Sequence, residues 1–237
     1  MKLINLPNIV TCGNLLCGCL AILFGLRGDM GLCCISIVCG AVFDFLDGLV
    51  ARAMHISGPI GKELDSLADV VTFGVAPSVL CYTIIDTYVG PQGWLSLVAF
   101  VMAAFSALRL AKFNVDVRQA TSFVGLPTPA NAILWIGLYY IQDIPSVHKV
   151  LGPWVFVVLM AVCCWMLICE LPMFSLKVKP QHNGLLENKT RYSFIALTVV
   201  ILAGSAIMGF RYFCASPAVV ILLYLLLSVI DDKVRNK

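Results

Sequence analysis

Four aspartates lie inside apolar stretches of the sequence, where charged side chains are rare. Asp44 and Asp47 are three residues apart, and Asp65 and Asp69 are four residues apart. These spacings place each pair on one face of a helix. Aspartate at the centre of a lipid-facing helix costs about 2.5–3.5 kcal/mol, so such residues usually serve a function. Two helices that meet antiparallel can direct all four carboxylates to one place.

This acidic cluster favours divalent cations. Four bare carboxylates held together would repel one another and retain protons. Oxygen ligands suit Mg²⁺, Mn²⁺ or Ca²⁺, and the lack of histidine or cysteine ligands beside the acids argues against zinc. Two such cations can hold a diphosphate and neutralise charge when a phosphoryl centre is displaced. The alternative is a set of ion pairs with Arg52 and Lys62, which would neutralise only two of the four acids.

Small residues accompany the acids at helical spacing. Gly48 and Ala51 share the face of the first acid pair, and Gly61 lies one turn before Asp65. They leave room for a bulky group to lie against the backbone, although small residues also serve ordinary helix packing. Arg52 offers a rigid fork of donors for phosphate oxygens. Together with the acids, these residues predict a site for a nucleotide diphosphate.

Read in order, the acids and their neighbours form the pattern DxxDGxxAR, eight further residues, then GxxxDxxxD, between residues 44 and 69. This pattern resembles the signature of the CDP-alcohol phosphatidyltransferases. The resemblance implies a membrane enzyme that moves a phosphatidyl or similar group from a CDP-linked donor to an alcohol and releases CMP. It also implies two divalent cations, Mn²⁺ or Mg²⁺, at the four aspartates, with Asp69 as general base. Nucleotide contacts are implied for Gly48, Ala51, Arg52 and Gly61.

Flanking segments narrow the resemblance to one branch of that family. Residues 7–18, 63–78, 109–115 and 125–132 are similar to the membrane-embedded phosphatidylserine synthases of bacteria and archaea. The chain departs from that branch at Thr72 (typically Ser), Lys112 (typically Arg) and Asn131 (typically Ala). The branch implies CDP-diacylglycerol and L-serine as substrates and a homodimer. Because the core signature is common to the family, glycerol phosphate or inositol phosphate remains an alternative acceptor.

Two further pairs of polar residues are candidate ligand contacts. Arg109 and Lys112, three apart near a helix end, are predicted to hold a lipid phosphate or the serine carboxylate, or else to anchor that end in the membrane surface. Asn8 and Thr11 are predicted to reach the nucleotide, with helix capping after Pro7 as the alternative for Asn8.

Composition dictates the elements that must position these residues. The chain is 60% hydrophobic and only 12% charged, whereas soluble domains carry about 25% charge. Each of eight apolar stretches approximates the length that crosses a bilayer: 9–26, 30–51, 60–85, 94–111, 127–142, 152–169, 192–210 and 213–230. We therefore predict an all-α, polytopic membrane helical bundle of about eight spans. It would form a single domain over residues 1–237, with residues 9–169 as the catalytic core and residues 190–231 as two additional helices.

The distribution of basic residues predicts the orientation. With the N-terminus inside, all of the 16 Lys and Arg except Arg27, Lys149 and Arg211 fall on the inner side, which favours two cytoplasmic termini. The protein would lie in the cytoplasmic membrane, with the acids near the cytoplasmic boundary of the hydrocarbon core. At that depth both membrane lipids and a soluble reactant can reach them. A net charge of +3 gives no support for nucleic-acid binding. An ion or proton transporter is a distant alternative. Such proteins usually have broken helices near the midplane and repeat symmetry, and neither feature is evident in the sequence.

Overall fold

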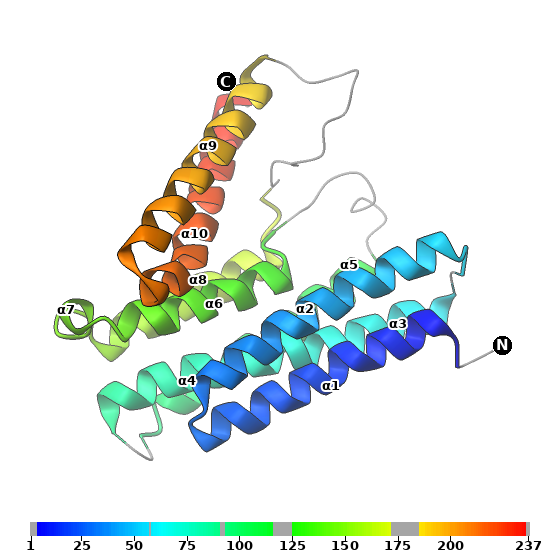
Figure 1. Cartoon of the computed structure of the whole chain (residues 1–237), viewed down its shortest axis with the longest axis horizontal. Coiled ribbons are helices and arrows are strands. Elements are labelled where there is room, and N and C mark those ends of the chain that lie inside the picture. Colours follow the sequence, from blue (N-terminus) through cyan, green and yellow to red (C-terminus); the bar gives the residue numbers. More distant parts are fainter. Residues whose placement is uncertain (1–3, 57, 91–92, 116–124, 172–184, 236–237) are drawn as a thin grey trace.

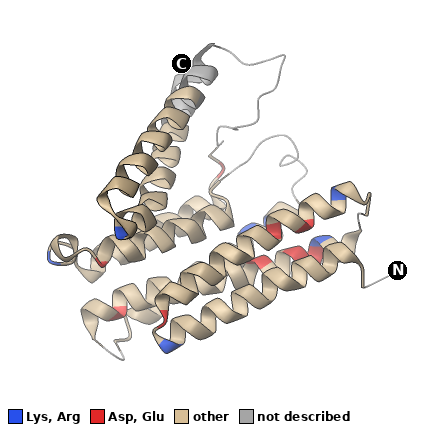
Figure 2. Ribbon diagram, in the orientation of Figure 1, with Lys and Arg blue, Asp and Glu red and all other residues tan. Residues whose placement is uncertain are grey.

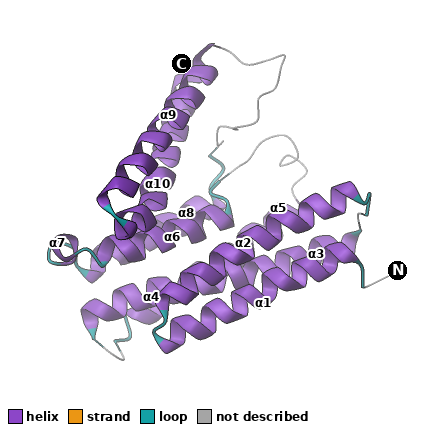
Figure 3. Cartoon of the chain, viewed as in Figure 1, coloured by secondary structure: helices purple, strands orange, loops and turns teal. Residues whose placement is uncertain are grey.

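The computed structural model describes residues 4–56, 58–90, 93–115, 125–171 and 185–235, and within these ranges the chain is helical with no strand (Figures 1 and 3). The predicted all-helical class is confirmed. Five helical stretches are long and apolar enough to cross a membrane: Leu6–Arg27, Met30–Ala53, Pro59–Val89, Ser96–Val115 and Phe210–Val229. Pro153–Ile168 and Tyr192–Met208 are apolar but shorter. The count of eight spans and their orientation stay predictions.

Helices α1 (Leu6–Arg27) and α2 (Met30–Ala53) form an antiparallel hairpin. The side chain of Asn5 accepts a hydrogen bond from the Asn8 amide at 2.9 Å, which caps the start of α1. Gly28 ends α1 with a φ of 86°, a left-handed conformation that glycine adopts without strain. The tight turn that follows lets α2 run back along α1 over its whole length (Figure 1).

The third long stretch is one continuous helical path with a change of winding inside it. Helix α3 (Pro59–Asp69) passes into a π-helical segment, η1 (Val70–Val75), which continues as α4 (Ala76–Val89). Single turns of π-helix inside α-helices occur frequently at functional sites. Here the change begins at the residue after Asp69, so the faces of α3 and α4 are rotated relative to each other. The sequence predicted the helix but not this segment.

Helices α5 (Val101–Val115), α6 (Thr128–Gln142) and α8 (Pro153–Ile168) pack with α4 around the larger apolar core. A short 3₁₀ segment, η2 (Ser96–Phe100), leads into α5, and the four-residue helix α7 (Pro145–His148) joins α6 to α8. Trp135 of α6 and Phe156 of α8 are among the largest fully buried side chains. A second core joins α1, α2, η1 and α6.

Helices α9 (Leu185–Met208) and α10 (Phe210–Arg235) form a C-terminal hairpin that leaves the bundle at a steep angle in Figure 1. Helix α10 packs on α6. A Cβ atom on Gly137 would lie only 2.6 Å from the backbone nitrogen of Ala218. The glycine therefore permits the close approach of these two helices, as small residues do in membrane proteins.

Candidate active site

Three of the four predicted acids meet in space. Carboxylate oxygens of Asp44 and Asp47 on α2 and of Asp65 on α3 lie within 4.8 Å of one another. Asp47 is buried and the other two are half-buried. Asp47 Oδ2 and Asp65 Oδ1 are buried and have no hydrogen-bond partner among the described residues. Clustered carboxylate oxygens with free lone pairs form a donor set that fits a hard divalent cation such as Mg²⁺.

Asp69 lies one helical turn beyond Asp65 and is buried in a different environment. Its Oδ1 accepts a hydrogen bond of 3.0 Å from Nδ2 of Asn14, a fully buried side chain on α1. The Thr72 hydroxyl on η1 in turn donates to the backbone carbonyl of Asn14 at 3.0 Å. Because both bonds link α1 to the α3–η1 path, they fix the position of Asp69 relative to the other acids.

Two glycines make this contact possible. A Cβ atom on Gly18 of α1 would lie 2.9 Å from the Thr72 backbone, and one on Gly40 of α2 would overlap the Thr72 methyl group. The π-helical segment therefore sits directly against the backbones of α1 and α2. Larger residues at either position would push Thr72, and with it Asp69, away from Asn14.

A pocket of about 580 Å³ opens beside the acid cluster between α1, α2 and α3. Asp47 and Asp65 line it on one side. The predicted nucleotide residues that also line it are Asn8, Thr11, Gly48, Ala51 and Gly61. A Cβ atom on Gly61 would lie 3.3 Å from Asn8 Oδ1, so the glycine keeps this part of the pocket open. The structure thus brings these five residues, Asp47 and Asp65 to one cavity, whereas Asp44 and Asp69 are not part of its lining.

Lys62 of α3 belongs to the lining of the pocket, whereas the predicted nucleotide contact Arg52 of α2 does not. Arg52 is exposed, and its guanidinium lies back along α2 over Gly48, 3.6 Å from where a Cβ would be. Lys62 lines the pocket and donates to the backbone carbonyl of Asn114 at 2.7 Å. The Asn114 amide donates to Ser66 Oγ at 2.8 Å. Both bonds tie the C-terminal end of α5 to α3 beside the acids. Figure 2 shows the acidic and basic positions of α2 and α3, red and blue on the ribbon, gathered at this end of the bundle.

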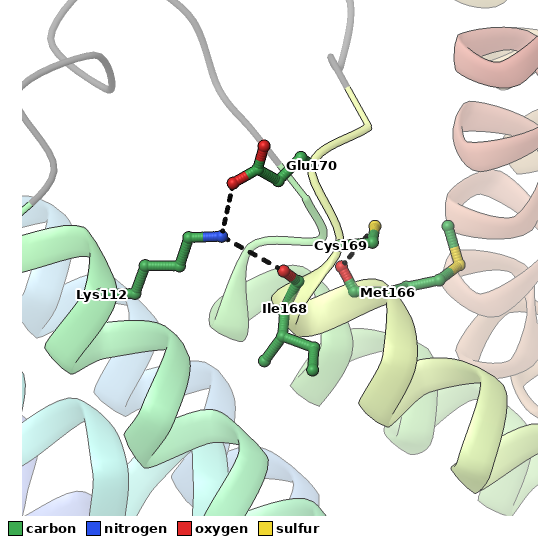
Figure 4. Close-up of polar contacts among 5 residues, drawn as sticks. All are labelled: Lys112, Met166, Ile168, Cys169 and Glu170. Atoms are coloured by element: carbon green, nitrogen blue, oxygen red, sulfur yellow. Dashed lines mark hydrogen bonds and ion pairs between the residues drawn. The ribbon is translucent and has the colours of Figure 1, made fainter.

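The structure places Arg109 and Lys112 in different surroundings. Arg109 is 7% exposed, its guanidinium lies 5.9 Å from the centre of the Phe113 ring, and it follows Ser106, which contacts Gly74 of η1, by one turn. Lys112 faces away from the acids and forms an ion pair of 3.2 Å with Glu170, together with a bond of 3.4 Å to the carbonyl of Ile168 (Figure 4). Of this predicted pair, only Arg109 is close to the site.

Sequence reasoning missed Asn14, Thr72, Lys62 and Asn114 as parts of the site. A signal for Asn14 was present, because Asn8, Thr11 and Asn14 recur every three residues along one face of an otherwise apolar helix. Thr72 was noted only as a departure from a flanking pattern. Lys62 and Asn114 depend on a contact between α3 and α5 that no local pattern reveals.

Comparison with known proteins adds to this geometry. The model of the CDP-alcohol phosphatidyltransferase family matches residues 4–165, which include every residue of the site. The chain belongs to the CDP-alcohol phosphatidyltransferase family. Its members are transferases of phospholipid biosynthesis that depend on divalent metal. The family resemblance carried by residues 44–69 is thereby confirmed.

The names of three curated relatives all refer to serine. The CDP-diacylglycerol–serine O-phosphatidyltransferase of Bacillus subtilis is 40% identical over 124 residues, 52% of this chain and 69% of that protein. The enzyme of the same name from Mycobacterium leprae is 31% identical over 206 residues, 84% of this chain and 66% of that protein. The archaetidylserine synthase of Methanothermobacter thermautotrophicus is 36% identical over 145 residues, 57% of this chain and 58% of that protein. This chain is similar to all three, and each name includes serine.

Proposed function

We propose that this protein transfers the phosphatidyl group of CDP-diacylglycerol to the hydroxyl of L-serine, giving phosphatidylserine and CMP. The observation that carries the proposal is the meeting of Asp44, Asp47 and Asp65 beside a pocket lined by Gly48 and Gly61. Acids beside a cavity with small walls suit a nucleotide diphosphate. Serine as acceptor is supported by the names of the relatives.

Asp44, Asp47, Asp65 and Asp69 would hold two divalent cations, Mn²⁺ or Mg²⁺. Bound there, the cations would supply charge neutralisation at the diphosphate and stabilise CMP as a leaving group. The unpartnered oxygens of Asp47 and Asp65 support this assignment, because buried carboxylate oxygens otherwise carry a large desolvation cost.

Asp69 is the proposed general base. Asn14 donates to one of its oxygens, which leaves the other free to accept the proton of the serine hydroxyl. The serine oxygen then forms a bond to the phosphorus that bears the diacylglycerol, and the bond from that phosphorus to the CMP oxygen breaks. Proton abstraction by a positioned carboxylate contributes about 10²–10⁴-fold to such a reaction.

The remaining predicted contacts divide between the two ligands. Asn8, Thr11, Gly48, Ala51 and Gly61 would contact the cytidine nucleotide, since all five line the pocket. Arg52 would bind phosphate oxygens by turning from its present position along α2. Arg109 and Lys112 remain proposed contacts of a lipid phosphate or the serine carboxylate; the buried Nε of Arg109, which has no partner among the described residues, supports that role for Arg109.

We further propose a single membrane domain of eight spans in the cytoplasmic membrane, with both termini and the active site on the cytoplasmic side. The asymmetry of basic residues supports this orientation. A homodimer is proposed from the family resemblance alone.

The test is CMP release by the purified protein in detergent, given CDP-diacylglycerol and Mg²⁺ or Mn²⁺. Parallel reactions contain serine, glycerol 3-phosphate, inositol phosphate or no acceptor, each repeated with EDTA and with the Asp69→Asn variant. We expect release that requires serine and is abolished by EDTA and by the substitution. Metal-dependent release with another acceptor would retain the family chemistry and refute serine as the acceptor. A folded protein inactive under every condition would refute the proposed transfer and direct attention to ion or proton transport.

A further inference from the structure

A second group of polar side chains is buried on α5 and α6, outside the pocket. Ser106, Thr128 and Asn131 are 0% exposed, and Arg109 is 7% exposed. Ser106 Oγ, Arg109 Nε, Thr128 Oγ1 and both amide atoms of Asn131 have no hydrogen-bond partner within the described part of the chain. Enclosed polar atoms without partners are costly, and in native proteins they call for a ligand, water or another explanation.

These four residues, which we call the α5–α6 polar set, lie on facing sides of two antiparallel helices. The C-terminal end of α5 and the start of α6 both lie at the end of α8, because Lys112 bonds to the Ile168 carbonyl (Figure 4) and the Leu126 amide bonds to the Met166 carbonyl. Met102 of α5 and Trp135 of α6 belong to one core cluster.

Helical spacing places the polar set at one depth. Ser106 and Arg109 lie four and seven residues after Met102, and Asn131 and Thr128 lie four and seven residues before Trp135. At about 1.5 Å per residue, each pair is displaced from the core cluster by about 6 and 10 Å in the same direction. Spacings of four and seven also keep the residues on the face of their helix that bears the core residue.

Ser106 of the polar set contacts the π-helical segment that follows Asp69. Ser106 packs on η1, where a Cβ atom on Gly74 would lie 3.1 Å from that of Ser106. Asp69 lies five residues before Gly74 on the same helical path, and Arg109 lies one turn after Ser106 on α5. The pocket with the predicted nucleotide residues is instead formed by α1, α2 and α3. The polar set therefore lies outside the pocket and against the segment that follows Asp69.

We propose that the α5–α6 polar set binds the charged end of an amino-acid acceptor and that Asn131 raises the affinity for it. This inference rests on the proposed transfer to serine. The general base must meet the acceptor hydroxyl as well as the donor, and the polar set lies against the segment that follows Asp69 but outside the pocket.

The chemistry of the set matches a zwitterion. The single buried guanidinium of Arg109 and the amide N–H groups of Asn131 suit a carboxylate. The carbonyl oxygen of Asn131 and the hydroxyl oxygens of Ser106 and Thr128 can accept from an ammonium group. Glycerol phosphate or inositol phosphate would bring additional negative charge and no ammonium group to this place, so the set favours an amino acid over those acceptors.

The test compares Asn131→Ala with the wild-type protein and with Gln142→Ala. Gln142 is a matched control, since it is a buried amide at the opposite end of α6 whose Oε1 lies 3.3 Å from His148 Nδ1. For Asn131→Ala we expect the KM for serine to rise about tenfold, the loss of one hydrogen bond to a charged group. The KM for CDP-diacylglycerol and kcat should stay within about twofold of wild type. Gln142→Ala should leave the KM for serine unchanged.

A second readout separates binding from packing. The Tm of the protein without ligands should not fall in Asn131→Ala, because the substitution removes an enclosed amide without partners. The rise in Tm that L-serine gives the wild-type protein should shrink. An unchanged KM for serine, or an equal rise in both KM values, would overturn the assignment.

Thr128→Val supplies an independent variant that removes one hydroxyl at nearly constant shape, should Asn131→Ala fail to fold. Its KM for serine should also rise, and an unchanged value would overturn the assignment. Wild-type protein that does not use serine would refute the proposed function itself, whereas serine-dependent wild-type activity with unaltered variants refutes only this inference.

Discussion

The bundle of α1, α2 and α3 and the hairpin of α9 and α10 are both built from apolar helices, but they satisfy their polar side chains differently. In the bundle, Asn14 bonds to Asp69, and Thr72 bonds to the Asn14 carbonyl, so polar groups join separate helices. In the hairpin, the hydroxyls of Ser205 and Ser216 donate to carbonyls of their own helix, and the bond from Arg211 of α10 to Asp143 beyond the end of α6 lies at the exposed surface. Bonds between helices fix relative positions, while bonds within one helix do not. We therefore expect substitutions in the bundle to alter activity and those in the hairpin to alter stability or nothing.

Asp65→Asn should give the largest effect of any substitution in this comparison. Loss of one charged oxygen ligand removes several kcal/mol of charge stabilisation, which corresponds to a decrease of about 1,000-fold in kcat/KM. The Tm in EDTA should stay equal or rise, because one of three mutually repelling carboxylates is gone. CMP release and thermal unfolding, each with and without Mg²⁺, measure both quantities. A variant with full activity would show that Asp65 is not a metal ligand.

Gly137→Ala tests the hairpin and should act on stability alone. A Cβ at this position would lie 2.6 Å from the Ala218 nitrogen and 3.0 Å from the Ala215 carbonyl oxygen. The backbone of α6 or of α10 must therefore move to make room for it. Overpacking of this kind typically costs about 1–3 kcal/mol. We expect a lower Tm with KM values for both substrates unchanged. A changed KM for either substrate would mean that the hairpin positions the active site, and the contrast between the two regions would fail.

Thr72→Val tests whether the bond between α1 and η1 matters for activity. The substitution keeps the shape but removes the donor to the Asn14 carbonyl. One hydrogen bond contributes about 1 kcal/mol to stability, so the Tm should fall slightly. If the bond also holds Asp69 beside its partners, kcat should fall about tenfold while the KM for CDP-diacylglycerol stays constant. A lower Tm with wild-type kcat would assign Thr72 to packing only.

The same contrast explains what the sequence could predict. Asp44, Asp47, Gly48 and Ala51 lie on one helical face, so their shared place beside the pocket follows from periodicity. The separate environment of Asp69 does not follow, because it depends on the π-helical segment after it. Apolar stretches predicted the helices, including α9 and α10, whose steep packing on α6 rests on the paired small residues Gly137 and Ala218.

The contact of α3 with α5 through Lys62 and Asn114 marks where sequence reasoning ends. The two residues are 52 positions apart, and the bond joins a side chain to a backbone carbonyl. No residue type at position 114 is required for that acceptor, since every residue supplies a carbonyl group. The Asn114 side chain does depend on its residue type, because its amide donates to Ser66 Oγ at 2.8 Å, but no local spacing pairs residues 48 positions apart.

Ser216→Ala should have the smallest effect of these substitutions and serves as the reference for the comparison of the bundle with the hairpin. Ser216 is 2% exposed, as buried as the polar residues of the site, but its hydroxyl donates to the Phe213 carbonyl of its own helix at 2.7 Å. Alanine is the better helix former, which offsets the lost bond, and the expected change in stability is within about 0.5 kcal/mol. Activity, both KM values and the Tm should match wild type when measured beside Thr72→Val. If Ser216→Ala lowered kcat as much as Thr72→Val does, burial of a hydroxyl rather than its bond between helices would account for both results.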